Sequence, residues 1–351
     1  MRLGNLERRE ISRYANLYDF TEAFRDKTVL VTGSKGIVGS GVVRWLLWLN
    51  ESDRANIKII VSTRDVVNVP DWIEPDDAVE WCLFGEESAY CEDRCIDYVV
   101  HAAAPTSNKV FKAVPVESLR VIVDGAERML ELAREHGSSL VYLSSEEAYG
   151  TPQSDLPLPE TYVGAVDSMS TRSCYPLGKK VGELLCRCYF EEYGVDAKVI
   201  RPTVILGLWQ PYDSVKVEAE IMRCIVEGKD LVMHSDGSTK KCVVYSLDAI
   251  AATLVVLTRG GGGGAFNATN PSTFSSVADR ARSLFAEFRP ELKIVFEKLD
   301  KAPSLGYLPK RSLLEDVSKI RALGWEPQAS MADICRIDLE RFGWLRCVGG
   351  E

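Results

Sequence analysis

The sequence has little of what metal centres and disulfide frameworks require. Its 351 residues contain three histidines, and no two of its ten cysteines are spaced as Cys-x2-Cys. Zinc sites need several such ligands at close spacing, and disulfide frameworks are typical of short secreted chains. We therefore expect no metal, and thiols that stay buried and reduced.

Long apolar runs and an excess of basic charge are missing as well. No run approaches the roughly 18 apolar residues that cross a bilayer, and residues 1–20 lack the continuous apolar core of a signal peptide. The 42 basic and 51 acidic residues leave a net charge of −9, which disfavours binding to nucleic acid or to anionic membranes. We expect a cytoplasmic protein with no nucleic-acid partner and no membrane partner.

What is present is an ordinary globular composition in which short apolar runs alternate with helical periodicity. Hydrophobic residues make up 46% of the chain and charged residues 26%, as in folded domains. Strands are predicted at residues 28–32, 57–62, 96–101, 140–144 and 197–201. Helices are predicted at residues 38–49, 116–136 and 175–193. This alternation predicts an α/β fold with a doubly wound parallel sheet.

A glycine-rich turn joins the first predicted strand to the first long helix. Glycines at such a turn permit tight backbone geometry and close approach to a pyrophosphate, whose charge is favoured at a helix N-terminus. The alternative is a plain tight turn. The residues expected to hold a dinucleotide here are Gly33, Ser34, Lys35, Gly36, Ile37, Val38 and Gly39.

The end of the second predicted strand bears on the choice between NAD and NADP. A carboxylate there accepts hydrogen bonds from ribose hydroxyls, whereas an arginine accommodates a 2′-phosphate. No acid stands at the last strand positions, and Ser62, Thr63 and Arg64 together offer donors for a phosphate. We predict NADP, with NAD nearly as well supported because Asp65 follows directly.

Tyr175 and Lys179 lie four residues apart in a predicted helix. Residues at this spacing share one helix face, so the ammonium group lies near the phenol. A free tyrosine has a pKa of about 10, and a neighbouring cation lowers that value. The pair is therefore a candidate proton-transfer site.

Ser145, Glu146 and Glu147 follow the strand predicted at 140–144. Ligands bind at the carboxyl ends of parallel strands. Ser145 is expected to hydrogen-bond a substrate hydroxyl beside Tyr175. The two carboxylates are candidates for a general acid and a general base, and the alternative for each is the start of a solvated loop.

Taken in order, these motifs resemble the extended short-chain dehydrogenases/reductases of the NAD-dependent epimerase/dehydratase family. The resemblance runs over about residues 27–342 and includes the glycine motif, Ser-Ser-x-x-x-Tyr-Gly at 144–150 and Gly-Trp-Glu-Pro at 324–327. It implies an NAD(P)-binding Rossmann domain at 1–205, with 241–262 returning to it. A smaller, mostly helical substrate domain is expected at 206–240 and 263–351.

The resemblance also implies further binding residues. Those expected at the cofactor are Ala102, Ala103, Ala104 and Pro202, besides Tyr175 and Lys179. Those expected at a nucleotide-diphosphate sugar are Thr106, Arg172, Thr203, Lys241 and Arg311. Members of the family often pair through helices, so a homodimer is expected.

The stretch 164–179 is similar to that of UDP-glucuronate decarboxylases, and the run 145–150 is similar to that of nucleotide-sugar 4,6-dehydratases. Three positions depart from the family pattern. Ile122 and Val204 stand where relatives have asparagine, and Lys241 stands where an arginine usually meets the diphosphate. These departures leave the cofactor prediction intact and put the usual sugar nucleotide in doubt.

The implied chemistry begins with oxidation at the sugar C4, for which Tyr175 takes the hydroxyl proton. In a dehydratase Glu147 would then remove the C5 proton, and Glu146 would assist loss of the C6 hydroxyl. In a decarboxylase a second carboxylate would repel the carboxylate of the substrate. We therefore predict a 4,6-dehydratase. The alternatives are a decarboxylase, a 4-epimerase, a keto-sugar reductase and a non-catalytic sugar-nucleotide binder.

Overall fold

The computed structural model describes residues 3–64, 78–297 and 310–344. Its main feature is a sheet of seven parallel strands in the order β11-β7-β5-β4-β1-β2-β3. The strands are β1 (Thr28–Thr32), β2 (Lys58–Thr63), β3 (Val79–Leu83), β4 (Tyr98–His101), β5 (Ser139–Leu143), β7 (Ala197–Pro202) and β11 (Ala265–Ala268). This sheet confirms the predicted Rossmann-type α/β fold.

The strand order reverses direction at β1, which has β4 on one side and β2 on the other. Thr32 pairs with His101 of β4 and with Ser62 of β2. The predicted strands become real strands because their runs are almost wholly buried, with valine and isoleucine on both faces. Open sheets of this kind bind ligands in the crevice at such a reversal point.

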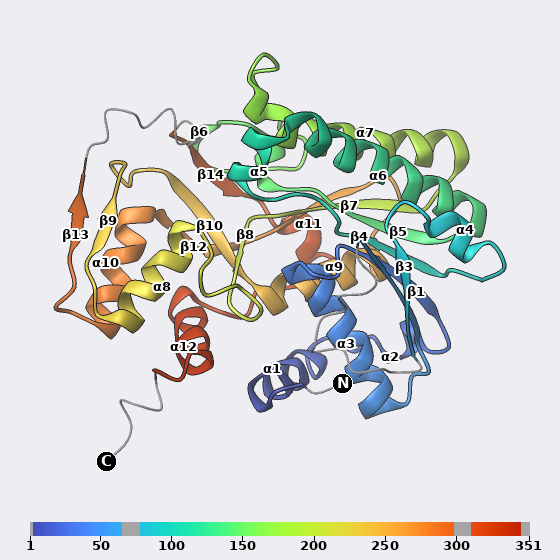
Figure 1. Ribbon diagram of the computed structural model, residues 1–351, viewed down its shortest axis with the longest axis horizontal. Coiled ribbons are helices and arrows are strands. Elements are labelled where there is room, and N and C mark those ends of the chain that lie inside the picture. Colours follow the sequence, from blue (N-terminus) through green and yellow to red (C-terminus); the bar gives the residue numbers. More distant parts are fainter. Residues whose placement is uncertain (1–2, 65–77, 298–309, 345–351) are drawn as a thin grey trace.

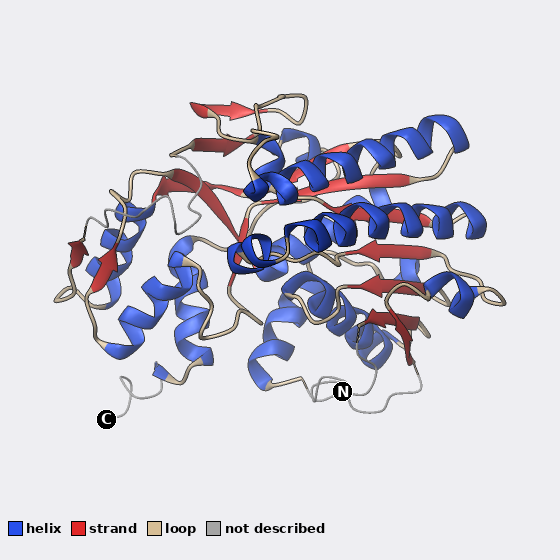
Figure 2. Ribbon diagram, turned by 45° about the horizontal axis from the view of Figure 1, so that its top comes forward, coloured by secondary structure: helices blue, strands red, loops and turns tan. Residues whose placement is uncertain are grey.

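Long helices cover both faces of the sheet, as Figures 1 and 2 show. Helices α6 (Pro115–His136) and α7 (Cys174–Tyr193) lie side by side on one face, and α3 (Ile37–Asp53) and α9 (Ser246–Arg259) cover the other. α6 and α7 bury one face against the strands, whereas α3 and α9 are buried on nearly all sides. Two short helices, α4 (Glu87–Cys91) and α5 (Asn108–Ala113), lie in the connections beside α6.

Helices α1 (Asn5–Ala15) and α2 (Thr21–Phe24) precede the first strand. Tyr14 is fully buried, and its hydroxyl donates a hydrogen bond of 2.8 Å to Asp248 of α9. Burial raises the pKa of Asp248 to about 6. The N-terminal segment is thus an integral cover of the α3–α9 layer.

The second unit combines strands with helices. Its larger sheet runs β12-β10-β14-β6, with β8 pairing to β10, and β13 pairs with β9. These strands are β6 (Gln153–Leu158), β8 (Val204–Leu206), β9 (Leu231–Met233), β10 (Lys240–Tyr245), β12 (Asn270–Ser276), β13 (Ile294–Phe296) and β14 (Ser312–Glu315). The helices are α8 (Val217–Glu227), α10 (Val277–Phe288) and α12 (Met331–Arg341), whereas α11 (Ser318–Arg321) packs against β11 of the main sheet.

Several details of the predicted division need correction. Residues 153–158 were assigned to the Rossmann domain, but they form β6 of the second sheet. Residues 265–268 were assigned to the substrate domain, but they form β11, the edge strand beside β7 in the main sheet. Residues 241–245 were expected to return to the first domain, but they lie in β10 of the second sheet, and the return begins with α9. The strands of the second unit were not predicted because most are short and pair only with distant segments.

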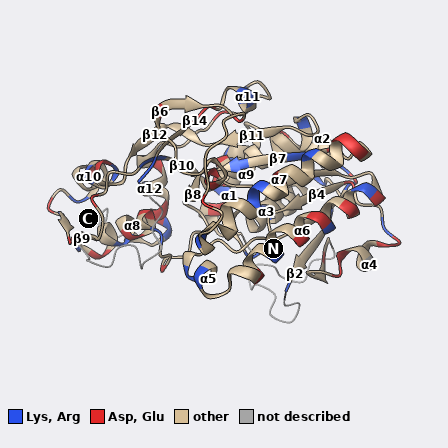
Figure 3. Cartoon of the chain, turned by 90° about the horizontal axis from the view of Figure 1, so that it is seen from above, with Lys and Arg blue, Asp and Glu red and all other residues tan. Residues whose placement is uncertain are grey.

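Charged residues of both signs are spread over the helices in Figure 3. In the described ranges no helix is both long and apolar enough to cross a membrane. Across the same ranges no group of histidine, cysteine, aspartate and glutamate side chains is arranged to hold a metal ion.

Candidate functional site

The glycine-rich turn lies between β1 and α3, at the sheet's reversal point. Gly33 has a φ of +70°, and a Cβ there would lie 2.6 Å from the carbonyl carbon of Ala102. A Cβ at Gly39 would lie 2.4 Å from the carbonyl oxygen of Gly33. The Ser34 hydroxyl is buried without a hydrogen-bond partner in the described structure. This close cradle of backbone at the N-terminus of α3, with an unused donor, fits a dinucleotide pyrophosphate.

The end of β2 has a feature that the sequence analysis missed. The buried Ser62 hydroxyl donates a hydrogen bond of 2.5 Å to Glu87 of α4, which also accepts from the backbone of Gly85 at 2.7 Å. Thr63 is buried, Arg64 is exposed, and Asp65 lies outside the described residues. Glu87 supplies a carboxylate at this strand end from a distant position in the chain.

Tyr175 and Lys179 share one face of α7, as their spacing predicts. Tyr175 is 8% exposed and stacks on Phe111 of α5 with ring centres 4.8 Å apart. Lys179 is buried, its ammonium lies 5.9 Å from the Tyr175 ring centre, and it donates a hydrogen bond to the carbonyl of Leu143. The pair therefore reaches the carboxyl end of β5, next to Ser145.

The pKa of Tyr175 differs from the expectation. Burial and the negative charge of Glu147 raise it well above 10, although a hydrogen bond with Ser145 and the charge of Arg172 act in the opposite direction. Burial also lowers the pKa of Lys179 to about 7. In the protein by itself the lysine therefore does not lower the pKa of the tyrosine, because its own charge is costly at this depth.

Ser145 and Glu147 lie in the turn after β5. Ser145 caps η1 (Glu146–Tyr149), and its Oγ accepts a hydrogen bond of 3.2 Å from the backbone of Glu147. Both oxygens of Glu147 accept from Arg172 Nη2 at 2.9 Å. Arg172 lies in η2 (Thr171–Ser173), just before α7. Its guanidinium carbon lies 4.9 Å from the ring centre of Phe111. These contacts hold Glu147 and Arg172 close enough to Tyr175 for both charges to act on it.

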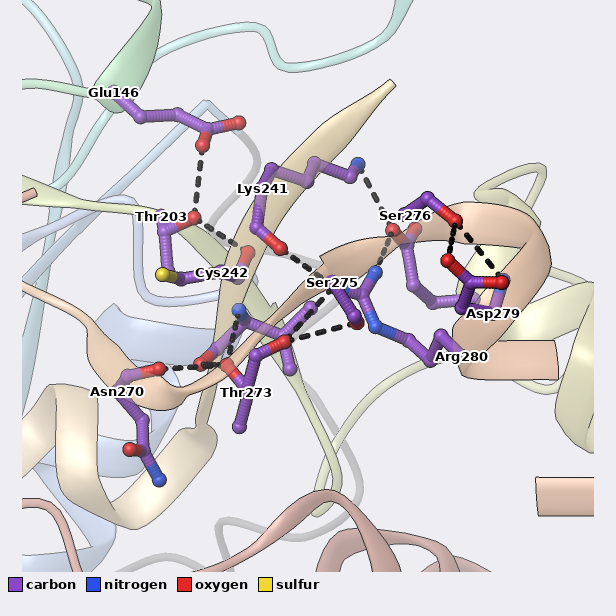
Figure 4. Close-up of polar contacts among 12 residues, drawn as sticks. Glu146, Thr203, Lys241, Cys242, Asn270, Thr273, Ser275, Ser276, Asp279 and Arg280 are labelled. Carbon is purple, nitrogen blue, oxygen red and sulfur yellow. Dashed lines mark hydrogen bonds and ion pairs between the residues drawn. The ribbon is translucent and has the colours of Figure 1, made fainter. Parts of the chain in front are cut away.

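Glu146 turns in the opposite direction, into the second sheet. It accepts hydrogen bonds from Thr203 at 2.8 Å and from Arg311 at 2.5 Å. The side chains of Glu146 and Arg311 are 6% and 5% exposed, so this ion pair is buried. Figure 4 shows Thr203 reaching both Glu146 and the carbonyl of Cys242. The residue is therefore no solvated loop position.

Lys241 lies in β10 with a carboxylate beside it. Its ammonium is 2.9 Å from Glu218 of α8, and Arg280 of α10 is 3.2 Å from the same oxygen. Figure 4 also shows Arg280 reaching the carbonyl of Lys241. The two cations lower the pKa of the buried Glu218 to about 2. The sequence analysis missed Glu218, Arg280 and the nearby half-buried Lys216, whose pKa is lowered by burial.

The other predicted residues follow the strand ends. Ala102, Ala103 and Ala104 lie directly after β4, where the backbone of Ala103 donates to Thr32 at 3.2 Å. Pro202 ends β7. Thr106 is exposed on the loop before α5. The structure thus brings Tyr175, Ser145, Glu147 and Arg172 together, and joins Glu146 to Arg311 beside them.

A second pair of charges supports the turn after β5, and sequence reasoning did not find it. Glu183 of α7 accepts hydrogen bonds from Ser144 and, through both oxygens, from Arg201 of β7. Arg201 also packs over the ring of Tyr149 at 4.9 Å. The only available signal was the position of Ser144 and Arg201 near neighbouring strand ends.

Known proteins resemble this chain in sequence. The family model described as the NAD dependent epimerase/dehydratase family matches residues 29–269. UDP-glucuronic acid decarboxylase 3 of Arabidopsis thaliana is 27% identical over 313 residues, which cover 87% of this chain and 86% of the relative. UDP-glucuronic acid decarboxylase 1 of Xenopus tropicalis is 27% identical over 330 residues, covering 93% of this chain and 74% of the relative.

Solved structures have the same fold. A UDP-glucose 4-epimerase from Thermotoga maritima, solved with UDP-glucose, has a TM-score of 0.74 at 22% identity, covering 92% of this chain and 99% of its own. A dTDP-glucose 4,6-dehydratase from Streptomyces venezuelae, solved with NAD, has a TM-score of 0.72 at 22% identity, covering 90% of this chain and 98% of its own.

Proposed function

Because the chain belongs to the NAD-dependent epimerase/dehydratase family, we propose that it is a nucleotide-sugar enzyme that oxidises the sugar C4 and then decarboxylates a hexuronate. When bound, a nicotinamide dinucleotide would supply the acceptor for the C4 hydride and, after loss of carbon dioxide, the hydride that reduces C4 again. Tyr175 takes the C4 hydroxyl proton, for which the positive charge of an oxidised nicotinamide ring would have to lower the raised pKa of the phenol. Ser145, which shares a hydrogen bond with Tyr175, would orient the same sugar hydroxyl by a second hydrogen bond. Lys179 lies one turn further along α7 and places its ammonium group 5.9 Å from the ring centre of Tyr175.

The buried ion pair between Glu146 and Arg311 is the observation that favours decarboxylation. The sequence analysis preferred dehydration because a second carboxylate would repel the substrate's own. Arg311 offsets that charge at 2.5 Å, so the objection no longer holds. A carboxylate whose oxygens accept from Arg311 and Thr203 is also poorly set up to donate a proton to a leaving hydroxyl. The names of the curated relatives agree with this choice.

Dehydration, the outcome predicted from the sequence, remains the second candidate. Glu146 and Glu147 are adjacent carboxylates in different surroundings, one paired with Arg311 and one with Arg172. Such a division is what separate acid and base roles require. The sequence-based preference for a 4,6-dehydratase stays a prediction.

One experiment separates these reactions. The protein is incubated with UDP-glucuronate, dTDP-glucose and UDP-galactose in turn, and the products are weighed by mass spectrometry. Loss of carbon dioxide from UDP-glucuronate supports the proposal, and loss of water from dTDP-glucose supports dehydration. Unchanged mass with an inverted C4 indicates epimerisation. Steady consumption of reduced cofactor when a 4-keto sugar nucleotide is added indicates a reductase, and binding without turnover of any sugar contradicts the enzymatic proposal.

The cofactor in this proposal is NAD rather than the NADP predicted from the sequence. Glu87 stands beside Ser62 at the end of β2, where a carboxylate accepts from ribose hydroxyls and repels a 2′-phosphate. The Ser62 hydroxyl is already committed to Glu87. Arg64 is the feature that still favours NADP. Denaturing the purified protein and identifying the released dinucleotide by chromatography tests the choice, and recovery of NADP alone contradicts it.

The proposed assembly is a homodimer through α6 and α7. The two helices are neighbours (Figure 1) and carry exposed apolar side chains at Val116, Leu119, Val181 and Leu184. Exposed apolar groups gathered on one face are typical of protein interfaces. Pairing two such faces would form a four-helix interface.

A further inference from the structure

Glu315 is a buried acid to which the proposed function gives no role. It ends β14 and is 1% exposed, and neither of its carboxyl oxygens accepts a hydrogen bond of standard geometry in the described part of the chain. Its own backbone N–H and the weakly donating Cys242 thiol are the donors that approach it. Buried polar groups are nearly always hydrogen-bonded, so each exception calls for an explanation. An ionised carboxylate in this position would be costly, whereas a protonated one costs much less.

Arg311 connects Glu315 to the candidate site. It lies just before β14, and alternation along a strand places residues 311, 313 and 315 on one side. Arg311 Nη2 binds Glu146, while Arg311 Nη1 is buried without a hydrogen-bond partner in the described structure. The backbones of Arg311 and Glu315 are about 13 Å apart along the strand, but the charge of each side chain still acts on the other. One guanidinium thus influences two carboxyl groups and is hydrogen-bonded to one of them.

We propose that Glu315 is a positioning residue that stays protonated and thereby keeps Arg311 committed to Glu146. When Glu315 loses its proton, a second carboxylate competes for the same guanidinium, and Glu146 loses part of its charge compensation. The protonation of Glu315 does not depend on what reaction the protein carries out, whereas its effect on turnover rests on the proposed function of Glu146.

The charges around Glu315 agree with this arrangement. Burial and then the negative charge of Glu146 raise its pKa to about 8, against the opposing effect of Arg311. The groups that face it are Arg311 from its own strand segment, Glu146 from η1 and the Cys242 thiol from β10. Burial keeps that thiol protonated by raising its pKa. Leu158 pairs with Glu315 from β6 and carries no charge.

The first test is the pH dependence of unfolding of the full chain, compared between the wild type and Glu315→Gln. Between about pH 4.5 and pH 8 the folded wild type keeps the Glu315 proton while the unfolded chain has lost it. Wild-type stability relative to the variant therefore falls as pH rises through this window. The ratio of the two unfolding constants should change by about tenfold per pH unit.

Asp338→Asn is the matched control. Asp338 is also a buried acid, and its pKa is raised to about 6, so its effect should end near that pH. A constant difference between the wild type and Glu315→Gln throughout the window would overturn the proposal.

A second measurement needs neither variant to fold. In the wild type, the infrared carbonyl band of a protonated buried carboxyl group should persist between about pH 7 and pH 8, where Asp248 and Asp338 are mostly ionised. Absence of this band overturns the proposal. Neither measurement uses a sugar. The proposal for Glu315 can therefore be supported even if the proposed sugar reaction is contradicted. If the enzyme does turn over, kcat should fall on the alkaline side in the wild type and less so in Glu315→Gln.

Discussion

Tyr175 is the residue on which the proposed chemistry most depends. The Tyr175→Phe variant keeps the ring that stacks on Phe111 and removes the hydroxyl next to Ser145. We expect kcat to fall about 10²–10⁴-fold, the usual contribution of general acid–base catalysis. Tyr193→Phe is the matched control, since Tyr193 is half exposed at the far end of the same helix. Equal activity of Tyr175→Phe and the wild type would contradict the proposed role.

Arg311 offers a prediction about stability at the same scale. Replacing it with methionine leaves Glu146 buried without its charge partner, and removing one member of a buried ion pair typically costs about 3–5 kcal/mol. We expect the double variant Arg311→Met/Glu146→Gln to recover a good part of this loss, because the uncompensated charge is gone. Denaturant unfolding near neutral pH measures both. If the double variant is no more stable than the single one, Arg311 does not act through Glu146.

At the scale of elements, the turn between β1 and α3 is set by two close backbone approaches. Gly39→Ala places a methyl group 2.4 Å from the carbonyl oxygen of Gly33, whereas Gly36→Ala places one 3.3 Å from the same atom. We expect Gly39→Ala to lose about 1–3 kcal/mol of stability and most of its bound dinucleotide. Gly36→Ala should lose less of both. Thermal unfolding and the dinucleotide content of the purified variants check this order, which the reverse ranking would contradict.

Some elements could be predicted from local sequence patterns and others could not. The glycine spacing predicted the turn at 33–39, and the i, i+4 spacing predicted the shared face of Tyr175 and Lys179, because both depend on neighbours along the chain. The strands β6 and β14 were not predicted. They pair with each other across more than 150 residues, and their short runs carry no clear alternation of polar and apolar residues.

At the scale of the whole molecule, the exposed face of α6 and α7 predicts the assembly. Leu184 is 61% exposed on α7, and Leu184→Glu would place a charge in the proposed interface. We expect this variant to sediment as a monomer and the wild type as a dimer in analytical ultracentrifugation. Leu17→Glu is the control, because Leu17 is 52% exposed after α1, away from this face. A wild-type monomer would rule out the dimer.

The sequence by itself determined the α/β fold and predicted both the glycine-rich turn and the closeness of Tyr175, Lys179, Ser145 and Glu147, since these rest on periodicity and on short spacings after strand ends. Only the tertiary structure decided which charges meet. Glu146 and Arg311 are 165 residues apart, and Ser62 and Glu87 are 25 apart. Lys241 of β10 meets Glu218 of α8, although a loop and the strand β9 lie between them in the sequence. Such pairs follow from sheet order and register, which no local pattern specifies, and their Coulomb energy depends on a burial that exists only after folding.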